Sequence, residues 1–183
     1  VNSYLTPEIV TAFIAEVPHV FLRVDELSAD EIENGVLSGT LDLGISFQPG
    51  NGREFDVETL FSEEFALVVH PDHYLSSRKQ VRVSDLIDVP LALLNRSYCT
   101  RRMIDAAFRE AGVSCRVSVE LNSVAGLVAI TECGGPPTIL PKLGVSSTKV
   151  TAIRLEQPTP TRKICLLRAT GHAPIRAREV FAD

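Results

Sequence analysis

The sequence predicts an α/β protein built as two lobes, and three observations lead to this prediction. Strand-like and helix-like segments alternate along the 183 residues, as βαβ units and a mainly parallel sheet require. The apolar run Phe65–Val69 is typical of a strand buried on both faces. His70-Pro71 interrupts it, and a late strand near Thr151 can return to the first part. We therefore expect two lobes joined by two crossing strands, residues 1–69 with 153–183 and residues 70–152, with a cleft between them.

The first lobe is expected to alternate helix and strand. Thr6 can cap the first helix, and Pro7 fits its first turn. Ser28 and Glu31 have the spacing of a capping box at the start of the second helix. In chain order we expect helix, strand, helix and strand over Thr6–Val17, Val20–Val24, Ser28–Gly39 and Leu41–Ile45.

The rest of the chain continues the alternation. Gly112 is a natural helix stop, and apolar residues alternate with polar ones from Val113 to Leu121, as in a half-buried strand. Helices are expected over Ser84–Ile87, Arg102–Ala111, Ser123–Cys133 and Pro174–Phe181. Strands are expected over Leu91–Leu94, Val113–Leu121, Thr138–Leu140, Val150–Leu155 and Lys163–Ala169.

Charge and hydropathy exclude two classes of protein. The formal net charge is −5, whereas isolated DNA-binding domains are usually basic. We therefore expect no DNA binding by this chain alone. No apolar run approaches the roughly 20 residues that span a membrane, so we expect no membrane partner.

The sequence carries no pattern typical of a catalytic, metal or cofactor site. Catalytic motifs such as GxSxG, HExxH and GxxxxGK[ST] are missing. His70 and His73 flank a proline, so we do not expect them to form a pair of metal ligands on a helix. The four cysteines have no CxxC spacing, and we expect at least three to be buried thiols in a reducing cytosol, without a redox role; they are Cys99, Cys115, Cys133 and Cys165. The chain is thus expected not to be an enzyme.

Polar side chains gather where predicted strands give way to helices. Ligands of open α/β sheets bind beyond the carboxyl ends of strands, where helix N-termini present unpaired N–H groups. Such corners contain Asn2, Ser3 and Tyr4; Ser46, Phe47 and Gln48; Thr100 and Arg101; and Asn122 and Ser123. Each hydroxyl or amide can equally be a simple helix cap, and Arg101 a solvated helix residue. If all four corners meet, they can hold a small anionic ligand, and we expect Ser3, Ser46, Thr100 and Asn122 to be its main contacts.

The order of these segments resembles the effector domain of LysR-type transcriptional regulators over essentially the whole chain. The resemblance is carried by Asn2 to Pro7, by Leu41-Asp42-Leu43-Gly44-Ile45, by Phe65–Val69 with His70-Pro71, by Glu120 to Ser123 and by Ile139-Leu140-Pro141. Asn2-Ser3-Tyr4 and Thr100-Arg101 are most similar to the cyanate-responsive members. The two prolines at Pro136-Pro137 depart from the family pattern.

The resemblance implies a periplasmic-binding-protein-like fold (type 2) of two Rossmann-like lobes with an inducer in the cleft. It also implies a cytoplasmic protein, dimeric through its effector domains and tetrameric at full length. DNA would be bound through an N-terminal winged helix-turn-helix that is absent from this chain. An extracytoplasmic solute-binding protein, or less readily an enzyme on the same scaffold, remains an alternative. An upstream helix-turn-helix or a signal peptide would distinguish the first two.

Overall fold

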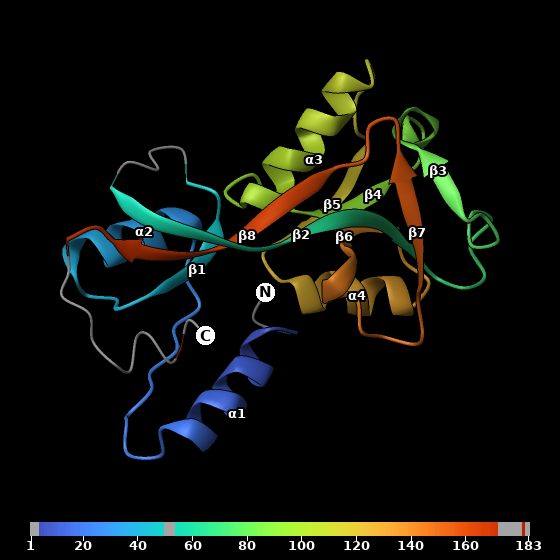
Figure 1. The fold of residues 1–183 in the computed structure, drawn as a ribbon. Helices are drawn as coiled ribbons and strands as arrows, with labels where there is room; N and C mark the ends of the chain where they lie inside the picture. Colours follow the sequence, from blue (N-terminus) through green and yellow to red (C-terminus); the bar gives the residue numbers. More distant parts are fainter. Residues whose placement is uncertain (1–3, 50–53, 172–180, 182–183) are drawn as a thin grey trace. The chain divides into compact units, whose positions relative to one another are not determined.

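The structure is a computed structural model that describes residues 4–49, 54–171 and 181 (Figure 1). The chain divides into two compact units, residues 1–62 with 162–183 and residues 63–161. The sequence placed the two boundaries after residues 69 and 152 instead. The first differs because β2 (Phe55–Val69) is a single strand of 15 residues, and only its apolar second half stands out in the sequence.

The second boundary differs because the returning strand is not the one expected. β7 (Thr151–Glu156) stays within unit 63–161, where it pairs with β2 and with β3 (Gln80–Arg82). β8 (Thr161–Ala169) instead continues into the other unit and pairs there with β1 (Gly44–Phe47).

Unit 63–161 contains a mixed sheet rather than a mainly parallel one. β4 (Leu91–Leu94) is parallel to β5 (Val117–Leu121) and to β6 (Thr138–Pro141), whereas β2 is antiparallel to β6 and β7. Two α-helices and two 3-10 turns complete the unit: α3 (Cys99–Glu110), α4 (Val124–Glu132), η1 (Val83–Leu86) and η2 (Lys142–Gly144).

The two helices lie on opposite sides of this sheet (Figure 1). Along β2, Phe65, Leu67 and Val69 pack in one apolar cluster with residues of α3. Val68 points the other way, into a second cluster with Leu127 of α4. This alternation confirms a strand buried on both faces, and it provides a rigid sheet whose strand ends can position polar groups.

The other unit is built around α2 (Ala29–Ser38), which packs on β1. Ser28 and Glu31 form the predicted capping box, and Gly39 ends the helix in the left-handed conformation. A Cβ on Gly44 would lie 2.5 Å from a methyl group of Ile32, so only glycine allows α2 to approach β1 this closely. β1 begins three residues later than expected and extends through Ser46 and Phe47.

Two predictions for the start of the chain were wrong. α1 (Thr6–Glu16) has Leu5 rather than Thr6 at its N-cap, without a side-chain cap. Residues 20–24 form no strand and are mostly exposed; Phe21 is 90% exposed. A strand needs a hydrogen-bonded neighbour, and this segment pairs with none among the described residues.

Two further expectations concern the chain ends and the membrane. The helix predicted over residues 174–181 falls almost entirely outside the described residues. Among the described helices, none has the length and apolar character needed to cross a bilayer.

Candidate functional site

The corner after β4 is built by a tight turn that leads into α3. Asn95 accepts a hydrogen bond from the main-chain N–H of Ser97 through its side-chain oxygen, at 3.1 Å. Tyr98 is the N-cap of α3 and provides no side-chain cap. Thr100 lies in the first helical turn and is buried. Thr100 is therefore not the N-cap, and the residue that is, Tyr98, makes no side-chain hydrogen bond to the first turn of α3.

The structure brings this corner together with the one after β5. Tyr98 donates its hydroxyl hydrogen to the carbonyl oxygen of Asn122 at 2.6 Å, and the N–H of Asn95 donates to the carbonyl oxygen of Leu121 at 2.9 Å. Asn122 and Ser123 are both exposed. Ser123 accepts from the N–H of Gly126 at 3.1 Å, so it fits the simple role of a helix cap.

Arg101 is buried and ion-paired rather than directed at solvent. Its Nε donates to Asp105 at 2.9 Å, and its Nη1 donates to Glu120 at 2.6 Å and to the carbonyl oxygen of Leu94 at 3.0 Å. Burial alone would lower the pKa of Arg101, but the hydrogen bonds that it donates to Glu120 and Asp105, together with their negative charges, outweigh this effect and raise it. The guanidinium is thus a permanent cation held by the protein itself.

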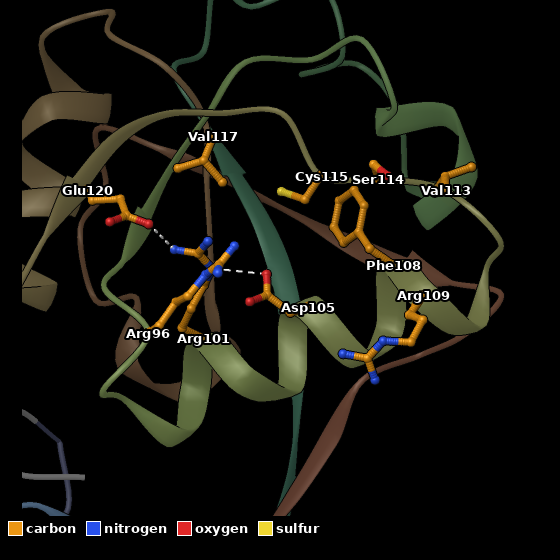
Figure 2. Close-up of a pocket in the computed structure, with 10 residues that line it drawn as sticks. All are labelled: Arg96, Arg101, Asp105, Phe108, Arg109, Val113, Ser114, Cys115, Val117 and Glu120. Atoms are coloured by element: carbon orange, nitrogen blue, oxygen red, sulfur yellow. Dashed lines mark hydrogen bonds and ion pairs between the residues drawn. The ribbon is translucent and has the colours of Figure 1, made fainter.

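A hollow of about 510 Å³ lies beside this ion-paired group, between α3 and β5 (Figure 2). Of its lining residues, only Arg101 had been proposed from the sequence as a ligand contact. Cys115 also faces the hollow, and burial, assisted by the negative charge of Asp105, raises the pKa of its thiol to about 11. Of the charged residues that line the hollow, Asp105 and Glu120 both pair with Arg101.

In the other unit, the hydroxyl of Ser46 is buried. Ser46 lies on β1, is 3% exposed, and its Oγ makes no hydrogen bond within the described residues. Phe47 follows it, and the Arg162 guanidinium carbon lies 4.9 Å above the Phe47 ring. Gln48 is exposed. The antiparallel pairing of β1 with β8 places the start of β8, and hence Arg162, beside the end of β1.

The first corner is only partly described. Asn2 and Ser3 lie outside the described residues, and Tyr4 is half-buried with its ring 6.5 Å from that of Phe61. Sequence reasoning missed Tyr98 and Arg162. The position of Tyr98 just before the predicted helix is a signal that could have identified it. Arg162 becomes a candidate only once β1 and β8 are known to pair.

The cysteines are less buried than predicted. All four are free; Cys165 is buried, Cys99 and Cys115 are half-buried and Cys133 is exposed. The expectation of at least three buried thiols was therefore wrong. Cys133 is the C-cap at the exposed end of α4, and Cys115 lies in the segment before β5, which is less deeply buried than its alternating pattern suggests. No cluster of potential metal ligands occurs in the part of the chain that the structure describes.

Comparison with known proteins gives a family match over the whole chain. A family model described as LysR substrate binding domain matches residues 1–183. The chain is 27% identical over 183 residues to an uncharacterized HTH-type transcriptional regulator, YybE, of Bacillus subtilis (strain 168), covering 98% of this chain and 62% of that protein. It is also 27% identical over 188 residues to the hydrogen peroxide-inducible genes activator of Dickeya chrysanthemi, covering 100% and 61%. The chain thus spans about three fifths of the length of these relatives.

Solved structures share the fold at low sequence identity. The CcmR regulatory domain of Synechocystis PCC6803, in complex with 2-PG, has a TM-score of 0.89 at 18% identity, covering 100% of this chain and 89% of that one. The effector-binding domain of QuiR, in complex with shikimate, has a TM-score of 0.83 at 21% identity, covering 98% and 87%. The reduced OxyR regulatory domain from Pseudomonas aeruginosa has a TM-score of 0.86 at 22% identity, covering 100% and 91%.

Proposed function

Because the chain belongs to the LysR substrate-binding domain family, we propose that it senses a small anionic metabolite through the polar corners described above. Membership confirms the predicted effector-binding domain of a LysR-type regulator and its periplasmic-binding-protein-like fold. It also confirms that the domain is not an enzyme, and it favours this reading over a solute-binding protein.

The observation that carries the ligand proposal is the hydroxyl of Ser46, which has no hydrogen-bond partner in the part of the chain that the structure describes. A buried hydroxyl without a hydrogen bond costs about 1–3 kcal/mol, and buried polar groups are almost always satisfied. A ligand atom that accepts or donates a hydrogen bond here would remove this cost. The guanidinium carbon of Arg162 lies 4.9 Å above the ring of Phe47, the residue that follows Ser46 on β1.

Unit 63–161 carries candidate ligand groups of its own at the start of α3. The N–H groups of a helix N-terminus favour negative charge, and Thr100 lies in this first turn. Asn122 is joined to the same corner by Tyr98. The sequence predicted that one ligand is held by Ser3, Ser46, Thr100 and Asn122 together, with Asn2, Tyr4, Phe47, Gln48, Arg101 and Ser123 as further contacts, and this remains a prediction.

The whole protein's action is also part of the proposal. We propose that effector binding shifts the population of regulator conformations, and that DNA is bound by a winged helix-turn-helix outside residues 1–183. We further propose a cytoplasmic protein that dimerises through this domain and forms a tetramer at full length. Of the relatives that extend beyond this domain, one is named as an HTH-type transcriptional regulator and another as a genes activator, which supports the DNA-binding part.

Thermal unfolding of the chain with a panel of ligands tests the proposal. The panel contains inorganic phosphate, 2-PG and shikimate, together with cyanate because of the sequence resemblance to cyanate-responsive regulators. A ligand at a hundred times its Kd stabilises by about 2.7 kcal/mol, which shifts the midpoint by several degrees. Hydrogen peroxide is added because a similar protein is named for it; our prediction of no redox role requires no shift with peroxide.

Ser46→Ala makes the test specific. Removing an unsatisfied buried hydroxyl should leave the free domain equally stable or more stable, while the ligand-induced shift decreases. Ser77→Ala, at an exposed serine of the other unit, should change neither quantity. A panel anion that stabilises the Ser46→Ala variant as much as the native chain would remove Ser46 from the site.

A further inference from the structure

The guanidinium of Arg101 is buried beside the proposed site, where it can hold the site in shape. Only 2% of Arg101 is exposed, and a charge buried to this extent is tolerated only when it is paired and hydrogen-bonded. Asp105 and Glu120 supply the opposite charges, and both contacts are drawn in Figure 2. The sequence made Arg101 a candidate contact of an anionic ligand, yet its Nε and Nη1 already donate to acceptors of this chain.

The three acceptors of Arg101 belong to three different elements. Leu94 is the last residue of β4, Glu120 lies next to the last residue of β5, and Asp105 lies one turn further along α3. A single planar side chain therefore links the start of α3 to the carboxyl ends of two neighbouring strands. These are the strand ends that carry Asn95 and Asn122.

The exposure of the two carboxylates indicates that these ion pairs fix the positions of the elements they join more than they stabilise the fold. Asp105 and Glu120 keep 27% and 49% of their side chains exposed, and ion pairs that water reaches contribute little to folding stability. The guanidinium fork, in contrast, fixes the direction of each hydrogen bond, which a flexible ammonium does not.

We propose that Arg101 is a positioning residue of the ligand site: it sets the place of Thr100 and the start of α3 relative to the Asn122–Ser123 corner. This inference rests on the proposed function, because it assumes that these two corners hold the ligand. Arg101 itself does not touch the ligand. Its neighbour in sequence, Thr100, is one of the groups whose place it sets.

Three variants separate geometry from charge. Arg101→Met removes the fork and the charge, whereas Arg101→Lys keeps the charge and loses the fork. Arg109→Met is the matched control, since Arg109 lies on the same helix, is exposed and makes no ion pair among the described residues. If Arg101→Met does not fold, Glu120→Gln replaces it, because that change removes one charged acceptor and leaves the buried arginine in place.

Amide hydrogen exchange of the chain measures the geometry without any ligand. We expect exchange of residues 95–101 and 121–124 to become about tenfold faster in Arg101→Met and Arg101→Lys, equivalent to about 1.4 kcal/mol of local opening. Arg109→Met should exchange like the native chain. Unchanged exchange at both corners would overturn the proposal, and so would an equal acceleration throughout the sheet, which would indicate loss of global stability.

Calorimetric titration with inorganic phosphate then measures the consequence for binding. We expect phosphate to bind both Arg101 variants roughly tenfold more weakly than the native chain, which corresponds to about 1.4 kcal/mol, and to bind Arg109→Met with unchanged affinity. Native affinity in Arg101→Lys would overturn the proposal, because charge alone would then suffice. If the native chain does not bind phosphate, the anionic ligand of the proposed function fails, while hydrogen exchange still decides whether Arg101 holds the two corners.

Discussion

The hydroxyl of Tyr98 donates a 2.6 Å hydrogen bond to the main-chain carbonyl oxygen of Asn122, which lies 24 residues further along the chain. This bond joins the two corners of unit 63–161 at the place where both leave the sheet. Tyr98 is itself partly exposed, so the bond lies at the edge of the unit rather than in its core. It is therefore a contact that can be removed with little effect on the fold.

Tyr98→Phe tests this contact. Losing one neutral hydrogen bond should lower the free energy of unfolding by about 0.5–1.5 kcal/mol, which urea denaturation can measure. The larger effect should be on ligand affinity, because the corner with Asn122 is no longer tied to the corner with Thr100. Tyr74→Phe, at an exposed tyrosine in the same unit, is the control. Equal loss of stability and of ligand affinity in both variants would contradict a special role for Tyr98.

Cys115 should react slowly with thiol reagents at neutral pH. Its raised pKa, about 11, leaves it as the thiol rather than the reactive thiolate. Mass spectrometry after timed alkylation should show Cys133, which is exposed, modified first. The rate at Cys115 should keep rising with pH until about 11. Rapid modification of Cys115 at neutral pH would contradict the structure around it.

The same pKa shift affects stability at alkaline pH. The thiol ionises more readily in the unfolded chain than in the folded one, so this group favours unfolding as pH rises from about 9 towards 11. Cys115→Ser removes the ionisable group, and its urea midpoint should depend less on pH in this range. An identical pH dependence in both proteins would show that Cys115 is not desolvated.

The apolar residues near the start of the chain predict where self-association occurs. Phe21 is 90% exposed, and Ile14 and Val24 are each about half exposed. A contiguous exposed apolar patch is typical of an interface, and we predict that these residues contribute to one. Phe21→Ser should raise the dissociation constant of the predicted dimer in sedimentation experiments, whereas Tyr74→Ser, in the other unit, should not. A native chain that stays monomeric at high concentration would contradict dimerisation by this domain.

Local signals predicted much of the fold. The capping box at Ser28 and Glu31, the strand Leu91–Leu94 and the helix stop at Gly112 each depend on residues within one or two turns, and the structure contains all three. The failures involve distant partners. Residues 20–24 have the alternation of a strand but pair with no neighbour among the described residues, and alternation alone cannot supply one.

In the candidate site, too, local features could be predicted from the sequence and contacts between distant segments could not. Thr100 was recognised because a helix was expected nearby, whereas the role of Arg101 depends on Glu120, 19 residues away. Arg162 lies over Phe47 only because β8 pairs with β1. Contacts between segments distant in sequence depend on the sheet topology, which residue patterns along the chain do not specify.

The most direct test of the central claim is a calorimetric titration of four proteins with the panel anion that stabilises the chain most: native, Ser46→Ala, Thr100→Ala and the double variant. Each hydroxyl that bonds the ligand should contribute about 0.5–1.5 kcal/mol, or about 1.5–3 kcal/mol where it meets a charged group. We predict one site per chain, several-fold weaker binding in each single variant and a further loss in the double variant. Native affinity in both Ser46→Ala and Thr100→Ala would contradict a ligand site at these corners.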